Sequence, residues 1–133
     1  MRNMILLVDD DALLLRATVR SVRGFIKRSE RSASVLEVSS PAEALELMRK
    51  HYSSDSDQRW CVITDFDMPG MNGATLLDVL NVELKERLLV RLVVSGREEN
   101  RMEALRRKAA FAVKPRISKD IEQTLTLFFS KTR

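Results

Sequence analysis

Five short apolar runs, rich in β-branched residues, constrain the fold of this 133-residue chain more than any other feature. Each run is nearly continuous in apolar character, which is typical of strands buried on both faces of a parallel sheet. The predicted strands are Met4–Val8, Val35–Val38, Cys61–Thr64, Val90–Val94 and Ala110–Val113.

Patterns with helical spacing fill the gaps between these runs. The predicted helices are Ala12–Arg28, Pro41–His51, Gly73–Leu84, Arg97–Lys108 and Ser118–Ser130. Ser40 is expected to cap the second helix in a capping box with Glu43, and Pro41 suits its first position. In the fourth helix, Met102 and Leu105 are expected to face the core. Because strand and helix alternate five times, we predict an α/β fold: a doubly wound five-stranded parallel sheet with five helices on its two faces.

Composition excludes several classes of protein and site. The single Cys and the single His exclude an intramolecular disulfide and a thiolate- or histidine-rich metal site. No apolar run is long enough to span a bilayer or to form a signal-peptide core, so we expect a cytoplasmic protein without membrane contact. The net charge of +4 is a mild bias, and no aromatic residue interleaves with a basic run, so direct nucleic-acid binding is not expected.

Polar side chains follow four of the five predicted strands. In a parallel sheet the carboxyl ends of the strands share one edge, where ligands bind. Crowded carboxylates at that edge must protonate or hold a cation, and a donor set without His or Cys favours Mg²⁺. An ammonium and a hydroxyl beside them suit a phosphoryl group. These residues are Asp9, Asp10, Asp11, Asp65, Asp67, Ser95 and Lys114.

Each of these short motifs also has an ordinary structural explanation. Acidic residues at 9–11 are common at a helix N-terminus, and Asp65 and Asp67 suit the turn before Pro69. Their joint placement at the correct strand ends is much harder to assign to chance.

The longer motifs resemble the receiver domain of bacterial two-component response regulators. They are Ile5–Asp11, Thr64–Gly73, Val93–Gly96 and Phe111–Pro115, and together they span nearly the whole chain. A chemotaxis member of that family has the flavodoxin-like strand order 2-1-3-4-5, so the resemblance implies this order here. It also implies one receiver domain over residues 1–133; because nothing follows the fifth helix, we expect no output domain.

The resemblance implies a metal site for Mg²⁺ or Mn²⁺. Asp65 corresponds to the phosphoacceptor and also ligates the ion. Asp10 would ligate the metal directly and Asp9 would hold it through water. The backbone carbonyl of Asp67 would complete the protein ligands.

The resemblance also assigns the groups that handle the phosphoryl group. Ser95 would hydrogen-bond it and shift toward it, and Lys114 would pair with its oxygens. The Lys114–Pro115 bond is expected to be cis. The donor would be a phosphohistidine on a sensor histidine kinase or a phosphotransfer protein, and the domain would catalyse only its own phosphorylation and dephosphorylation.

Two features depart from the usual family pattern. Position 111 is Phe where Tyr is common, so the switch residue can change rotamer but has no hydroxyl. The loop around Ser53–Arg59 is longer than usual, and we have no functional account of it.

Three hypotheses go beyond the family assignment. Asp67 and Arg97 are expected to form an ion pair over the mouth of the site. The basic segment Arg97–Lys119 suggests a face for an acidic downstream protein or for a homodimer. The first helix has more apolar residues than one buried face needs, so some of them are expected to be exposed and to dock the kinase; the candidates are Leu13, Leu14, Leu15, Val19 and Ile26.

Two other functions remain open. A haloacid-dehalogenase-like phosphatase also uses an Asp with a second Asp two residues later, which fits Asp65 and Asp67, but that motif should follow the first strand. A pseudo-receiver would bind partners without phosphorylation, which the complete acidic set argues against. A nucleotide-binding domain is weaker, because neither a dinucleotide fingerprint nor a P-loop is present.

Overall fold

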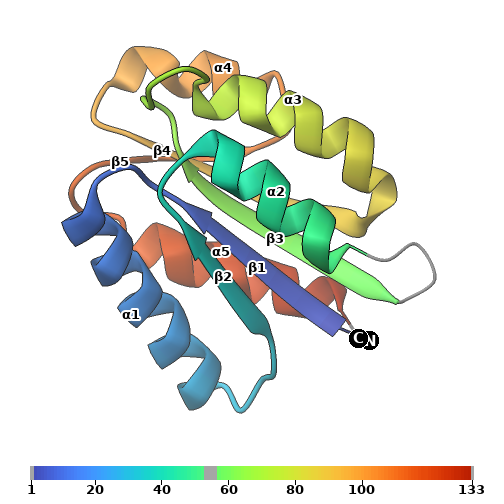
Figure 1. Ribbon diagram of the computed structural model, residues 1–133. Coiled ribbons are helices and arrows are strands. Elements are labelled where there is room, and N and C mark those ends of the chain that lie inside the picture. Colours follow the sequence, from blue (N-terminus) through green and yellow to red (C-terminus); the bar gives the residue numbers. More distant parts are fainter. Residues whose placement is uncertain (1, 53–56, 133) are drawn as a thin grey trace.

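A five-stranded parallel sheet forms the centre of the molecule (Figure 1). The computed structural model describes residues 2–52 and 57–132. The strand order is β2-β1-β3-β4-β5, and every neighbouring pair is parallel. The predicted fold class and strand order are therefore confirmed. The strands are β1 (Arg2–Val8), β2 (Ser34–Val38), β3 (Gln58–Asp65), β4 (Leu88–Ser95) and β5 (Ala110–Val113).

Helices cover both faces of the sheet. On one face lie α1 (Ala12–Arg28) and α5 (Ser118–Lys131), which contact each other. The other face carries α2 (Pro41–His51), α3 (Gly73–Leu84) and the short α4 (Arg101–Leu105) (Figure 1). Two short 3₁₀ turns complete the described elements: η1 (Lys85–Arg87) and η2 (Glu98–Asn100).

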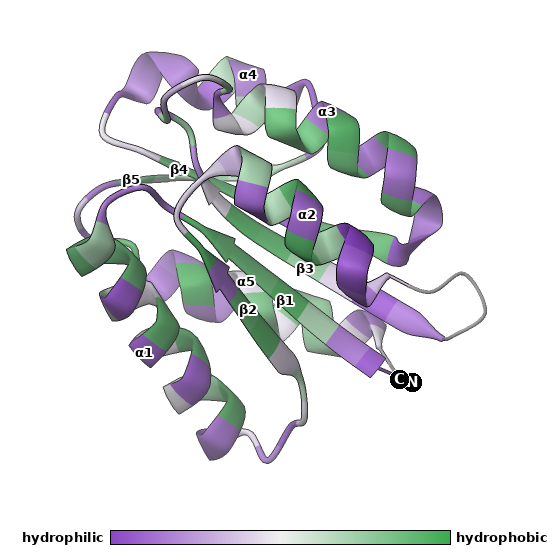
Figure 2. Ribbon diagram, viewed as in Figure 1, coloured by the Kyte–Doolittle hydropathy of each residue, from purple (hydrophilic) through white to green (hydrophobic). Residues whose placement is uncertain are grey.

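The hydrophobic core consists of two clusters, one on each face of the sheet. Along β1, Met4 and Leu6 belong to the cluster under α2 and α3, while Ile5 and Leu7 belong to the cluster under α1 and α5. Successive strand side chains point to opposite faces, so the covered part of such a strand is mostly apolar on both faces. Figure 2 shows strands that are hydrophobic over most of their length, with hydrophilic N-terminal ends on β1 and β3, and helices with one hydrophobic and one hydrophilic side.

The N-terminus of α2 follows the predicted capping pattern with one shift. The backbone N–H of Glu43 donates to Ser40 Oγ at 3.1 Å. The Glu43 carboxylate in turn accepts from the backbone N–H of Ser39 at 3.5 Å, one residue earlier than in the standard box. The helix α2 therefore begins at Pro41, as the sequence predicted.

The prediction for the fourth helix was wrong in length and in orientation. The α-helix covers only Arg101–Leu105, and Met102 and Leu105 are 58% and 52% exposed. Ala104 is the residue buried against the sheet. The helix ends because Lys108 takes a positive φ and the N–H of Ala109 turns back to the carbonyl of Ala104.

Among residues 2–52 and 57–132, the helices are all too short or too polar to cross a lipid bilayer.

Candidate functional site

Three carboxylates meet at the carboxyl edge of the sheet. Asp65 is the last residue of β3, rather than the first after it, and Asp9 and Asp10 directly follow β1. One carboxylate oxygen from each of the three lies within 4.8 Å of the others. Asp9 and Asp65 are buried, whereas Asp10 is exposed. The topology thus brings together acidic residues that are more than fifty positions apart in the sequence.

Lys114 joins this cluster from the end of β5. Its Nζ lies 3.0 Å from Asp65 Oδ1 and 3.5 Å from Asp9 Oδ2. Its backbone N–H donates to the carbonyl of Ser95 at 2.8 Å, which fixes the end of β5 against the end of β4. The Lys114–Pro115 bond is cis, as the resemblance implied.

Burial and crowding change the proton affinity of the cluster. Burial, together with the negative charge of Asp9, outweighs the opposing effect of Lys114 and raises the pKa of Asp65 to about 6. Burial also raises the pKa of Asp9. For Lys114 burial favours the neutral amine, but the contacts to Asp65 and Asp9 outweigh it, so its pKa is raised. The three carboxylates therefore carry more negative charge than the single ammonium of Lys114 neutralises.

We expect Asp65→Asn to stabilise the metal-free protein at pH 7 by about 1–3 kcal/mol, because each pKa unit corresponds to about 1.4 kcal/mol. The folded-state pKa of Asp65 lies above its ordinary value of 3.8, so the folded state binds the extra proton. The cost of the buried charge therefore develops between about pH 4 and pH 6 and is fully present above pH 6.

Urea denaturation of both proteins at pH 4 and pH 7, with a chelator present, measures this difference. The advantage of the Asn variant should nearly vanish at pH 4. The control, Asp120→Asn on α5, should show a much smaller change. An Asn variant that is less stable at pH 7 would contradict the electrostatic account.

Ser95 is the last residue of β4 and is fully buried. Its Oγ accepts hydrogen bonds from the backbone N–H of Arg97 at 3.1 Å and from Asn100 Nδ2 at 3.0 Å. Asn100 is itself buried, and sequence reasoning missed it. The one available signal was a neutral polar residue within a highly charged segment. Asn100 therefore holds the Ser95 hydroxyl toward η2.

Asp67 and Arg97 form the ion pair that their spacing predicted. The Arg97 guanidinium donates to Asp67 Oδ1 at 2.7 Å, and both side chains are exposed. The pair links the loop after β3 to the loop after β4. An exposed pair of this kind contributes only about 0–1 kcal/mol to stability.

Phe111 lies in the middle of β5 and is buried in the cluster under α3 and α4. The guanidinium carbon of Arg101 lies 4.8 Å from the centre of its ring. This cation–π contact places a charged group over the predicted switch residue. Sequence reasoning did not connect these two residues.

Gly73 supports the site from the first position of α3. A Cβ at this residue would lie 2.3 Å from the backbone oxygen of Asp65, so only glycine allows the two segments to approach so closely. The N–H of Gly73 also donates to the carbonyl of Phe66 at 2.8 Å. The position of Asp65 thus depends on a residue without a functional side chain.

Two other sequence expectations concern the surface. Of the five apolar candidates on α1, only Leu13 is exposed, at 74%, and the other four are half-buried.

In the segment that was expected to be a loop, residues 53–56 lie outside the described part of the chain. Gln58 and Arg59 belong to β3, so this part of the expectation was wrong.

The strand order and the acidic carboxyl edge define a flavodoxin-like α/β domain. The family model for the response regulator receiver domain matches residues 5–126, so the chain belongs to this family of two-component signalling switches. No curated protein sequence matches the chain.

Solved structures of receiver domains share the fold over nearly their whole length. A response regulator receiver domain protein from Clostridium thermocellum is 20% identical, with a TM-score of 0.76 over 98% of this chain and 96% of that one. The signal receiver domain of an HD domain-containing protein from Pseudomonas fluorescens is 19% identical, with a TM-score of 0.75 over 98% and 97%. The chemotaxis response regulator CheY4 of Vibrio cholerae is 19% identical, with a TM-score of 0.67 over 95% and 98%.

Proposed function

We propose that Asp65 accepts a phosphoryl group from a phosphohistidine and that this modification switches the conformation of the domain. The observation that supports this most is the position of the Asp65 carboxylate. It is buried at the strand edge, with Lys114 Nζ 3.0 Å away and two further carboxylates beside it. Phosphoryl transfer requires mainly positioning and charge neutralisation, which this arrangement offers.

Apart from the phosphohistidine donor and a proton from solvent, the transfer to Asp65 needs no other reactant. A carboxylate oxygen of Asp65 attacks phosphorus, and a P–O bond forms as the P–N bond to the donor imidazole breaks. The departing imidazole keeps the electron pair and takes a proton from solvent. In the hydrolysis step, water attacks phosphorus and releases a proton to solvent, the P–O bond to Asp65 breaks, and inorganic phosphate leaves the Asp65 carboxylate. Lys114 would neutralise the phosphoryl oxygens in both steps.

The donor set fits a hard divalent cation. Three carboxylates converge here without any His or Cys, which is the chemistry that Mg²⁺ or Mn²⁺ prefers. Asp9, Asp10 and Asp65 would hold the ion, together with the backbone carbonyl of Asp67. Such an ion would neutralise the excess negative charge of the site and the charge of the phosphoryl oxygens.

Mg²⁺ at ten times its dissociation constant is therefore expected to raise the free energy of unfolding by about 1.4 kcal/mol through mass action. Asp10→Asn removes a ligand that is exposed, so the fold should persist while the stabilisation is largely lost. Thermal melts with and without Mg²⁺ measure this effect, and Asp11→Ser, which retains an N-capping side chain for α1, is the control. Equal stabilisation of Asp10→Asn and the native protein would contradict the assigned ligand.

The proposed switch begins at Ser95. Its hydroxyl would leave Asn100 and donate to a phosphoryl oxygen, which would move the loop between β4 and η2. Phe111 and Arg101 follow this loop along the chain, so they would carry the change to the surface. The phosphoryl group would bias an equilibrium between two existing conformations.

Arg97→Ala is expected to shorten the lifetime of the phosphorylated form severalfold, because the bridge to Asp67 restricts the approach of the attacking water. The loss of phosphoryl mass with time, after removal of the donor, measures the lifetime. Arg116→Ala, on the exposed turn before α5, removes the same charge and should leave the lifetime unchanged. Equal lifetimes of Arg97→Ala and the native protein would contradict this role.

The partners would be a histidine kinase or phosphotransfer protein and a downstream protein. Exposed Leu13 on α1, close to the end of β1, is a candidate contact for the donor. On the segment Arg97–Lys119, several cations are already paired within the chain, including Arg101 with Glu98 and Arg106 with Glu103. An acidic partner or a second copy of the chain would therefore contact mainly those cations of this segment that are not paired within the described chain.

Two small phosphodonors separate this proposal from its alternatives. Phosphoramidate carries the same P–N bond as phosphohistidine, and with Mg²⁺ it should add one phosphoryl group to the intact mass. An aryl phosphate should not be turned over. Steady turnover of the aryl phosphate would favour the phosphatase, and no addition with Mg²⁺ bound would favour the pseudo-receiver.

A further inference from the structure

A second polar site lies at the opposite edge of the sheet from Asp65. It is an open depression of the surface with a volume of about 290 Å³, in which five of the six lining residues are cationic, and we refer to it as the basic cavity. Its lining comes from the end of α3, η1, the middle of β4 and the turn before β5. The lining residues are Asn81, Lys85, Arg91, Arg106, Arg107 and Lys108.

The positive charge of this cavity is only partly neutralised within the chain. Arg106 pairs with Glu103, and Arg107 pairs with Asp78 and Glu103. Over residues 2–52 and 57–132, no ion pair involves the other three cations, Lys85, Arg91 and Lys108. Three positive charges therefore remain around one cavity, without a counter-ion from the described chain.

Arg91 is the cation that most requires an anion. It is half-buried on β4, and among the described residues its guanidinium donates to neutral oxygens alone: Asn81 Oδ1 at 2.8 Å and the carbonyl of Leu88 at 3.2 Å. Burial lowers the pKa of Arg91, which reflects the cost of its charge there. A bound anion would offset this cost.

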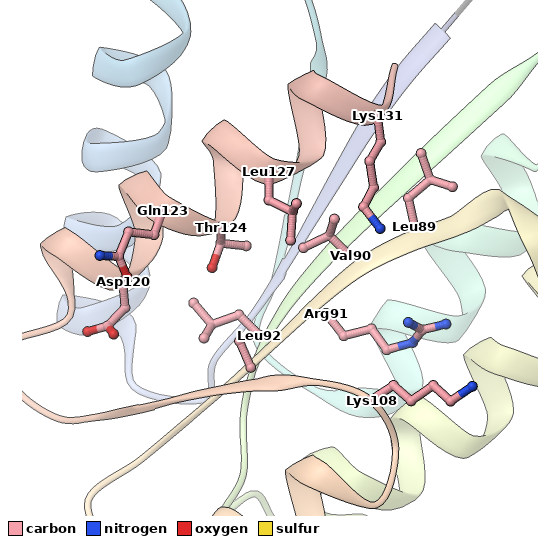
Figure 3. A pocket seen from close by; sticks show the side chains of 11 residues that line it. Leu89, Val90, Arg91, Leu92, Lys108, Asp120, Gln123, Thr124, Leu127 and Lys131 are labelled. Atoms are coloured by element: carbon pink, nitrogen blue, oxygen red, sulfur yellow. The ribbon is translucent and has the colours of Figure 1, made fainter. Parts of the chain in front are cut away.

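Figure 3 shows how two of these cations lie. Arg91 and Lys108 also border the neighbouring hollow beneath α5, and both side chains extend away from Asp120 and Gln123 on that helix. The two positive groups therefore point in the same direction, on the side of β4 where α3 packs.

Both lysines of the basic cavity occupy backbone positions that favour glycine. Lys85 has φ 53° and ψ −129°, and Lys108 has φ 58°. A side chain at positive φ is strained, and glycine is the usual residue at the end of a helix in this conformation. Glycine can therefore replace lysine at both positions without backbone strain.

We propose that the basic cavity binds a pyrophosphate group, either as free inorganic pyrophosphate or as part of a nucleoside diphosphate. Two linked phosphoryl groups carry enough charge to match the three uncompensated cations, and a guanidinium can contact two phosphate oxygens at once. The volume of the basic cavity lies just below the usual range for ligand sites, which suits a small ligand such as a diphosphate. No aromatic side chain is among its lining residues, so stacking of a base contributes nothing and the phosphates carry the recognition. The proposal is independent of the phosphorylation of Asp65.

Isothermal titration calorimetry with inorganic pyrophosphate, in a buffer without divalent ions, tests this site. The native chain should bind one equivalent. The double variant Lys85→Gly/Lys108→Gly should bind at least tenfold more weakly, and glycine relieves the backbone strain at both positions, so the variant should remain folded. The control Lys27→Gln/Lys50→Gln removes the same two charges from the exposed ends of α1 and α2 and should bind like the native chain.

A parallel titration with ADP distinguishes the sources of the group. Binding of ADP with an affinity similar to that of pyrophosphate shows that the nucleoside is accommodated and assigns a nucleoside diphosphate, whereas much weaker binding of ADP assigns free pyrophosphate. Absence of binding at millimolar pyrophosphate would overturn the proposal. So would an equal loss in both double variants, or binding of a single-stranded oligonucleotide without binding of pyrophosphate. Phosphorylation of Asp65 in the Lys85→Gly/Lys108→Gly variant reports on the other site separately.

Discussion

Replacing Lys114 with methionine is expected to slow phosphorylation of Asp65 from a small donor by about a hundredfold or more. Removing one electrostatic contact from a reacting centre typically costs about 10²–10³ in rate. Methionine has a similar length but no charge, so the Asp65 carboxylate loses the cation that lies 3.0 Å away. The same change leaves Asp9 and Asp65 without a partner ammonium, and breaking a pair at a buried site costs about 3 kcal/mol.

The rate is measured from the intact mass at successive times after acetyl phosphate and Mg²⁺ are added. Urea denaturation gives the stability. Lys119→Met, at an exposed position of α5, should change neither quantity appreciably. A Lys114→Met protein that is phosphorylated at the native rate would show that the ammonium does not act on the transferred group.

Gly73→Ala is expected to destabilise the domain by about 3 kcal/mol and to slow phosphorylation, although position 73 has no functional side chain. The new Cβ would lie 2.3 Å from the backbone oxygen of Asp65 and 3.1 Å from the Cα of Phe66. Both contacts are with backbone, so no side-chain rotation can relieve them, and the end of β3 must move away from α3. Overpacking of this kind costs about 1–3 kcal/mol and occasionally more.

Gly96→Ala is the matched control. It adds the same methyl group close to the same site, but apart from Gly96 and its two chain neighbours no atom of the described residues lies within 4 Å of the new Cβ. Its effect on stability should stay below about 1 kcal/mol. Equal urea midpoints for the two variants would show that the close approach of α3 to Asp65 is not required.

The sheet could be predicted because the covered part of each strand is mostly apolar on both faces, which leaves a nearly continuous apolar run in the sequence. The strand ends were less visible. Arg2 and Asn3 extend β1 by pairing with Gln58 and Arg59 of β3, and polar residues at a strand end give no such signal. The prediction for the segment around α4 was wrong because the sequence gives no clear sign of which side chain is buried. The small residue Ala104 is buried there, whereas the larger Met102 and Leu105 are exposed.

The acidic part of the site could be predicted because topology fixes it. Parallel strands share a carboxyl edge, so the positions of Asp9, Asp65 and Lys114 at strand ends predict that they meet there. The supporting contacts could not be predicted in this way. The bond of Asn100 to Ser95 and the approach of Gly73 to Asp65 depend on how two loops pack, and no spacing in the sequence encodes that distance.

The most direct test is to locate the phosphoryl group on the native chain. After treatment with Mg²⁺ and acetyl phosphate, borohydride reduction converts an aspartyl phosphate into homoserine, and peptide mass spectrometry reads its position. We predict homoserine at position 65 and at no other aspartate, with none formed in Asp65→Asn. Modification at Asp9, Asp10 or Asp67 in the native chain, or no modification while Mg²⁺ is bound, would contradict the assignment of Asp65 as the phosphoacceptor.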